Sequence, residues 1–373
     1  ANAILPQIAR AQALAEGVFP ASVRPGLRMS VLATAGMRLL PAETQEAIFQ
    51  GLRKGLADGG YPFDLSAFEA RTITGHEEGV FALVALNLLA GRIDSRVADA
   101  PRELVGVLDL GGSSTQVAAP PGREPAAGLA QRLGDAKATW TRSFLSYGME
   151  RMREATYAKI VDEGWNASRA LGIVGNPCAF YGYKEEGTMW RGIGEAQYCQ
   201  AYVNRVLLEE SAACEAQHSP RGLSGDLCLG GAAVPYEETL QYYLISGYMY
   251  VTDFAGWWLK HRGLSQAERP LAKPTVRDLR GAADALCAAA WPNVSAVALD
   301  PATRHGFTPE HKVPHRCFEM CYVIGLLTTG LGFPDDYAFE IVDRIDGVEI
   351  EWTLGAFLMS FHAGARRLTN EEL

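Results

Sequence analysis

Residues 104–119 read LVGVLDLGGSSTQVAA, and this stretch decides the fold. Its apolar start, residues 104–108, predicts a buried strand that delivers Asp109 to its end, and residues 115–119 predict a returning strand. The glycines between them, Gly111 and Gly112, let the backbone pass close to a bulky anion, which the N–H groups of such a turn can bind. An acidic residue beside the turn suits a divalent cation. The alternative is an ordinary hairpin with an aspartate at its turn, and these residues alone leave both interpretations open.

The composition is that of a globular protein with a sizeable core. Of 373 residues, 48% are hydrophobic and 21% are charged, and this length suggests two domains or one two-lobed fold. The formal net charge of −9 provides no basic stripe, which argues against a nucleic-acid binder. No apolar run approaches the roughly 18 residues that a membrane span needs. Expected strands at residues 29–33 and 71–74 alternate with helices, so the predicted class is α/β.

The cysteines and sequons indicate an oxidising compartment. Seven cysteines lie at positions 178, 199, 214, 228, 287, 317 and 321. None has the spacing of a zinc site, and the count permits disulfides. The sequons at Asn166 and Asn293 favour a glycosylated protein outside the cytosol, where disulfides persist. Separately, the aromatic-rich stretch at residues 240–259 is expected to form a helix.

Two further residues have the chemistry of a hydrolytic site. Glu78 comes at the start of a predicted helix, where a carboxylate stays ionised and suits a general base that activates water. Thr34 follows a predicted strand, where its hydroxyl could orient that water. The alternatives are a helix-start glutamate with no catalytic role and an ordinary turn threonine, and the residues themselves do not decide.

Four segments in order resemble the apyrases, or nucleoside triphosphate diphosphohydrolases (ecto-ATPases). Each motif alone is weak, but the ordered set is specific and covers nearly the whole chain. The segments are residues 33–38 (ATAGMR), 73–81 (ITGHEEGVF), 107–116 (VLDLGGSSTQ) and 352–358 (WTLGAFL), with further landmarks at residues 143–148, 176–178 and 246–254.

The resemblance implies a role for each matching residue. Glu78 would be the general base, and Asp109 would hold Ca²⁺ or Mg²⁺ through the water shell of the ion. The residues that would hold the attacking water are Thr34, Ser114 and Gln116. The residues that would bind phosphate are Gly111, Gly112 and Ser113. The candidate contacts to the nucleobase are Tyr248, Tyr250, Lys312 and Arg316, although an aromatic stripe on a helix is also typical of a core.

The resemblance also implies a fold and a disulfide pattern. The fold would be actin-like (ribonuclease-H-like) and two-lobed, with the nucleotide in a cleft between the lobes. Lobe I would comprise residues 1–74 and 345–373, and lobe II residues 75–344. The implied disulfides are Cys178–Cys199, Cys214–Cys228 and Cys287–Cys317, which leaves Cys321 over. The family has a further disulfide, and the position of one of its cysteines is occupied by Ser146 in this chain.

The first signature of the family, a second phosphate-binding hairpin, is not found in residues 1–373. Either an N-terminal segment is cleaved but retained as a partner, or it lies outside this sequence, or the protein lacks it and is non-catalytic. Because one oxyanion donor alone can contribute about 3 kcal/mol to catalysis, residues 1–373 by themselves are expected not to hydrolyse nucleotides.

The sequence therefore predicts a metal-dependent hydrolase of the terminal phosphates of nucleoside tri- and diphosphates. It would be extracellular, at the cell surface or in the lumen of the secretory pathway, with any membrane anchor outside this chain. The alternative is a non-catalytic apyrase-like module of an extracellular assembly. Another actin-like phosphotransferase fits the cysteines and the Glu78 segment less well.

Overall fold

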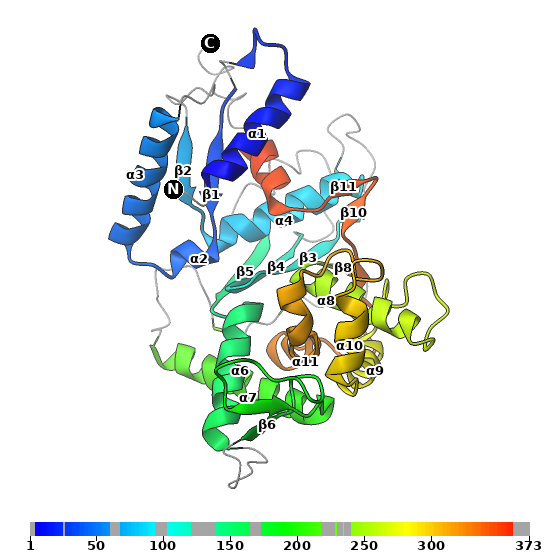
Figure 1. Ribbon diagram of the computed structural model, residues 1–373. Helices are drawn as coiled ribbons and strands as arrows, with labels where there is room; N and C mark the ends of the chain where they lie inside the picture. The colour runs from blue at the N-terminus through cyan, green and yellow to red at the C-terminus, as the bar shows by residue number, and fades with distance from the viewer. Residues whose placement is uncertain are drawn as a thin grey trace. The chain divides into compact units, whose positions relative to one another are not determined.

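The computed structural model describes residues 4–24, 27–59, 68–93, 103–120, 139–164, 173–217, 228–229, 234 and 240–360. The chain divides into two units, Ala1–Gly75 and His76–Leu373 (Figure 1). The lobe boundaries predicted above are not tested by this division and stay a prediction. Within the described residues, no helix combines the length and the apolar character needed to cross a membrane.

The first unit is a small parallel β-α-β arrangement. Strand β1 (Ser30–Ala33) pairs in parallel with β2 (Glu69–Thr72), and parallel strands need a crossover, which helices α2 (Ala35–Arg38) and α3 (Ala42–Asp58) provide. The helix α1 (Leu5–Val18) completes the unit. Its Ile8 is buried in one cluster with Phe49, Leu52 and Leu56 of α3.

The second unit is built around a five-stranded mixed sheet with the order β5-β4-β3-β8-β9. The expected strand–turn–strand is present as β3 (Gly106–Leu110) and β4 (Ser114–Ala119), which pair antiparallel. Every residue of both strands is buried, as expected for strands covered on both faces. The other three strands are β5 (Trp140–Leu145) and β9 (Glu340–Ile341) at the two edges and β8 (Tyr242–Ser246) between β3 and β9.

Helices cover the two faces of this sheet. On one face, α4 (Gly75–Leu89) packs with Val107, Ala118 and Ile245. On the other face, Leu108 and Val117 belong to a larger core, because successive side chains of a strand alternate between faces. This core is supplied by α6 (Met149–Glu163), α7 (Ala196–Gln217), α8 (Gly247–His261), α9 (Val276–Cys287), α10 (Trp291–Ala298) and α11 (Arg316–Gly325) (Figure 1).

Short elements complete the second unit. They are the parallel pair β6 (Val174–Asn176) and β7 (Trp190–Gly192), the 3₁₀ helix η3 (Glu310–His315), the π-helical turn η4 (Leu326–Gly330) and the hairpin of β10 (Arg344–Ile345) and β11 (Val348–Glu349). Residues 352–360 are helical.

The expected helix over residues 240–259 is wrong at its start. Residues 242–246 form strand β8 in the middle of the sheet, and α8 begins only at Gly247. Aromatic and β-branched residues such as Tyr242 and Ile245 favour a strand. A short apolar run next to a helix cannot be assigned by periodicity alone, which explains the error.

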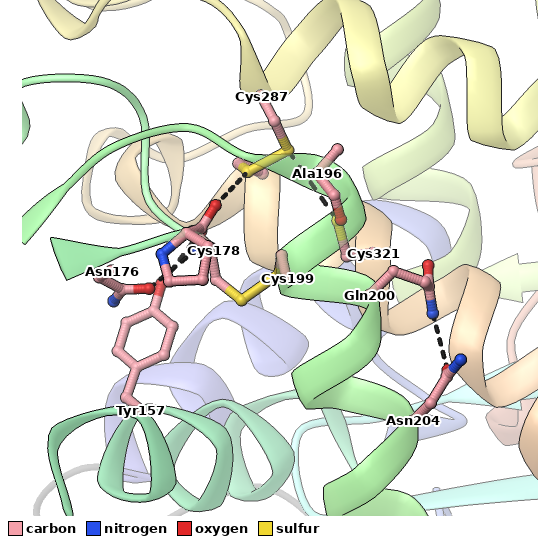
Figure 2. Close-up of a disulfide and its surroundings, with 11 residues drawn as sticks. Tyr157, Asn176, Cys178, Ala196, Cys199, Gln200, Asn204, Cys287 and Cys321 are labelled. Carbon is pink, nitrogen blue, oxygen red and sulfur yellow. Dashed lines mark hydrogen bonds between the residues drawn. A yellow bond between two sulfur atoms is a disulfide. The ribbon is translucent and has the colours of Figure 1, made fainter. Parts of the chain in front are cut away.

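The structure joins the three cysteine pairs that the resemblance implies, Cys178–Cys199, Cys214–Cys228 and Cys287–Cys317. Cys321 is a buried free thiol. Figure 2 shows it beside the disulfide of Cys287, with 3.9 Å between the Sγ atoms of Cys287 and Cys321. Cys317 and Cys321 are four residues apart on α11 and so lie on one helix face. Cys287 therefore has two cysteines within reach.

Replacing Cys317 by Ser is expected to redirect Cys287 to Cys321, because that thiol already lies 3.9 Å away. In the wild-type protein, burial raises the pKa of the Cys321 thiol to about 12, so little thiolate forms at neutral pH and the native pair persists. Peptide mapping under non-reducing conditions checks the pairing, and Cys321→Ser serves as the control that keeps Cys287–Cys317. Recovery of Cys287 as a free thiol in C317S would contradict this expectation.

Candidate functional site

The turn between β3 and β4 rests on the N-terminus of α6. The backbone N–H groups of Met149 and Glu150 donate to the carbonyl oxygens of Gly111 and Gly112 over 2.9 and 3.0 Å. In trans peptides the N–H points opposite to the carbonyl, so the N–H groups of Gly112 and Ser113 point away from α6. The glycines themselves are exposed. This geometry suits an anion-binding loop.

A second close contact holds the loop in place. A Cβ atom built on Gly148, the residue before α6, would lie 2.2 Å from the backbone N of Ser113 and 2.4 Å from the backbone C of Gly112. The N–H of Ser146 also donates to the carbonyl of Ser113 over 2.8 Å. Glycine is therefore required at position 148 for the turn to pack against the segment that leads into α6.

Gln116 is the centre of a buried polar cluster. Its Nε2 lies 2.8 Å from Ser114 Oγ, 3.1 Å from Ser143 Oγ and 3.2 Å from Glu78 Oε2. Ser114 and Gln116 are two residues apart on β4 and share a face, while Ser143 is the partner of Gln116 on β5. The structure thus brings together three of the predicted residues, Glu78, Ser114 and Gln116.

Gly79 explains how Glu78 reaches this cluster. A Cβ at Gly79 would lie 2.6 Å from Cγ2 of Thr141 and 3.6 Å from Cβ of Gln116. The first turn of α4 therefore lies directly on β4 and β5, and Glu78, in that turn, is only 7% exposed. A carboxylate in a first helical turn is favoured by the helix dipole, which fits a base that must remain ionised.

Asp109 lies on the same face of the sheet as Gln116, because the two are direct partners between β3 and β4. Its burial raises the pKa of the carboxyl, a hydrogen bond from the Ser246 hydroxyl lowers it, and the negative charge of Glu351 raises it again. A buried carboxylate next to a second acidic group is a hard oxygen donor whose charge a divalent cation would offset. The residues present therefore fit the cation that the sequence predicts.

The four predicted base contacts differ in accessibility. Tyr248 is fully buried, with its hydroxyl 3.4 Å from Thr115 Oγ1. Arg316 is 3% exposed and donates to Glu319 Oε2 over 2.7 Å and to Thr308 Oγ1 over 2.8 Å.

Tyr250 and Lys312 are half-buried. The Tyr250 ring lies 6.4 Å from that of Phe307. Lys312 forms an ion pair with Glu150, whose Cγ would be 3.3 Å from a Cβ at Gly112. The ammonium of Lys312 is thus held next to the turn at residues 111–113. A ligand can reach the half-buried Tyr250 and Lys312 more readily than Tyr248 or Arg316.

The remaining predicted residues lie elsewhere. Thr34 precedes α2 in the first unit, where its carbonyl accepts from the N–H of Met37, and its role beside Gln116 stays a prediction. Asn166 lies outside the described residues, while Asn293 is exposed on α10.

The sequence analysis assigned no role to two residues near the predicted ones, Ser143 and Ser246. Ser143 touches Gln116, and the register of β5 against β4 was needed to find it. Ser246 acts on the pKa of Asp109, and it lies within the stretch that was expected to be helical.

Comparisons with known proteins identify the family of this chain. The model of the GDA1/CD39 (nucleoside phosphatase) family matches residues 2–368. Ectonucleoside triphosphate diphosphohydrolase 7 of Mus musculus is 26% identical over 88% of this chain, and probable apyrase 6 of Arabidopsis thaliana is 23% identical over 92%. The chain spans only 58% and 60% of the lengths of these two relatives.

A solved structure shows the fold. The crystal structure of nucleoside triphosphate hydrolases from Neospora caninum matches with a TM-score of 0.59 at 17% identity, over 94% of this chain and 76% of that one. The expected actin-like α/β fold class is confirmed.

Proposed function

This chain belongs to the GDA1/CD39 (nucleoside phosphatase) family, and on that premise we propose that it hydrolyses the terminal phosphate of nucleoside triphosphates and diphosphates with water activated by Glu78. The observation that carries the proposal is the contact of Gln116 with both Glu78 and Ser114, on the sheet face that also holds Asp109. A base, two polar groups for a water and an acidic cation ligand are the parts that in-line hydrolysis requires.

In the proposed reaction, Glu78 accepts a proton from a water molecule that Gln116 and Ser114 hold. The water oxygen bonds to the terminal phosphorus, and the bond from that phosphorus to the bridging oxygen breaks, which leaves the shortened nucleotide and inorganic phosphate. No covalent intermediate with the protein forms. Thr34 would contribute to holding the water, as the family resemblance implies.

The turn at residues 111–113 would bind the phosphate oxygens through its backbone N–H groups, which are supported by α6. Asp109 would hold Ca²⁺ or Mg²⁺ through the water shell of the ion, and the cation would neutralise charge on the phosphates. Tyr250 and Lys312 are the proposed contacts to the nucleotide beyond the phosphates, whereas Tyr248 and Arg316 are buried.

We place the protein outside the cytosol, at the cell surface or in the secretory pathway. Its three disulfides support this location, because reducing compartments rarely keep such bonds. Any membrane anchor, retained N-terminal segment or extracellular assembly would lie beyond the residues described.

Hydrolysis in ¹⁸O-labelled water tests the proposed chemistry. The protein is purified from its native source as the full gene product and given ATP with Mg²⁺ or Ca²⁺ under single-turnover conditions. Attack of water on the terminal phosphorus predicts one ¹⁸O atom in the released phosphate and none in the ADP. Label in the ADP, or phosphate trapped on the protein, would refute the proposed attack.

A further inference from the structure

Three oxygen atoms lie within hydrogen-bond distance of the amide nitrogen of Gln116. They are Ser114 Oγ at 2.8 Å, Ser143 Oγ at 3.1 Å and Glu78 Oε2 at 3.2 Å. All four residues are buried, each at most 7% exposed, so the amide depends on protein partners. The nitrogen carries only two hydrogen atoms, so only two of the three acceptors can receive a full hydrogen bond at one time.

Glu78 is the acceptor whose strength changes in the proposed reaction. As a carboxylate it accepts a charge-assisted hydrogen bond, which is roughly twice as strong as one between neutral groups. Once it has taken the proton from the water, that advantage is lost, and one hydrogen atom of the Gln116 amide needs another acceptor. A buried N–H without an acceptor would cost free energy at that step.

Ser143 is placed to accept that hydrogen atom. It lies directly opposite Gln116 on β5, which pairs with β4 along its whole length, so the backbone ladder fixes its position. Its hydroxyl carries no charge, so its capacity to accept does not depend on the proton of Glu78. Ser114, by contrast, follows the turn at residues 111–113 and has to hold the attacking water in the proposed reaction.

We propose that Ser143 is a positioning residue, which accepts the Gln116 N–H that Glu78 releases when it becomes protonated. The amide then stays in place beside Ser114 through the reaction. This inference rests on the proposed function, in which Glu78 is the base and Gln116 holds the water. It adds strand β5 to the elements that supply the site.

The variant Ser143→Ala removes this acceptor and leaves the resting site intact. With Glu78 ionised, Glu78 and Ser114 still accept both amide hydrogen atoms, so KM for the nucleotide and the unfolding equilibrium constant are expected to stay within about twofold of the wild-type values. Loss of one buried hydrogen bond in the protonated state is expected to lower kcat about three- to tenfold. Steady-state kinetics and denaturant unfolding of the full gene product measure these quantities, and an unchanged kcat would overturn the proposal.

Thr141→Val is the matched control on the same strand. Thr141 is two residues from Ser143 and so shares its face of β5. It is buried, and its hydroxyl donates to Thr139 Oγ1 over 3.4 Å. The variant removes a buried hydroxyl that is bonded to Thr139 instead of Gln116, and it is expected to keep the wild-type kcat. Equal losses of kcat in T141V and S143A would assign the effect to the packing of β5 and contradict the role of Ser143.

A stability measurement that needs no activity separates this inference from the proposed function. Glu78→Leu removes the charged acceptor permanently, which leaves Ser114 and Ser143 for the two amide hydrogen atoms. Adding S143A to this variant is expected to raise the unfolding equilibrium constant about three- to tenfold, against at most about twofold in the wild-type background. An equal effect in the two backgrounds would show that Ser143 does not replace Glu78 as an acceptor.

The two proposals can therefore fail separately. If the wild-type protein hydrolyses no nucleotide but S143A destabilises E78L more than the wild type, the proposed function fails and Ser143 stands as the alternative acceptor. If nucleotide is hydrolysed and S143A keeps the wild-type kcat, the proposed function stands and the role of Ser143 fails.

Discussion

Replacing Glu78 by Gln is expected to lower kcat about a hundred- to ten-thousandfold, the usual contribution of a positioned general base. The substituted amide oxygen can still accept the hydrogen bond that Gln116 Nε2 gives to Glu78 over 3.2 Å. The fold and the affinity for nucleotide are therefore expected to change little. Steady-state phosphate release by the full gene product, together with its melting temperature, measures both effects.

Glu77→Gln provides the control for this prediction. Glu77 is the neighbouring residue in the first turn of α4 but is more exposed than Glu78, and it has no proposed role in the reaction. Its variant is expected to keep a kcat within about twofold of the wild-type value, since substitutions away from the reacting groups usually change little. Equal activity of the two variants would exclude Glu78 as the base.

Replacing Gly148 by Ala is expected to cost about 3 kcal/mol of the free energy of unfolding and to abolish activity. The added Cβ would lie 2.2 Å from the backbone N of Ser113, and backbone atoms cannot move aside as the end of a side chain can. The φ of −81° and ψ of 162° at Gly148 are open to alanine, so the effect is steric. Denaturant unfolding and phosphate release measure the two losses.

Gly281→Ala is the matched control in the same unit. Gly281 is exposed on α9, and a Cβ there would meet nothing within 4 Å. This variant is expected to gain roughly 1 kcal/mol, because alanine is the better helix former. If G148A unfolds at the same denaturant concentration as the wild type, close packing of Gly148 against Gly112 and Ser113 does not hold the turn in place.

Part of the site could be predicted from local patterns alone. The apolar run before Asp109 and the two glycines after it define β3, the turn and β4. Strand alternation then places Ser114 and Gln116 on one face. These features depend on residues close in the sequence, and the structure has them where they were expected.

Other parts depend on contacts between distant segments. Ser143 meets Gln116 through the register of β5, and Ile245 is paired with Asp109 only because β8 lies beside β3. The expectation of one helix over residues 240–259 missed strand β8, which ends at Ser246. The aromatic stripe of α8 also gave no indication that Tyr248 is buried while Tyr250 is partly accessible, because that helix is apolar on most sides.

The disulfide pairs were predicted from the family resemblance and not from spacing, since seven cysteines allow many pairings. Cys321 beside Cys287 shows why a single thiol cannot be placed from sequence. Its position follows from the packing of α11 against α9, which no local pattern encodes.

The most direct test of the central claim is the release of phosphate from ATP and ADP by the natively purified protein, measured with Ca²⁺ or Mg²⁺ and again after addition of a chelator. The account predicts release that needs the cation and stops with the chelator. No release from any nucleotide with either cation would contradict it, and would favour a non-catalytic apyrase-like module instead.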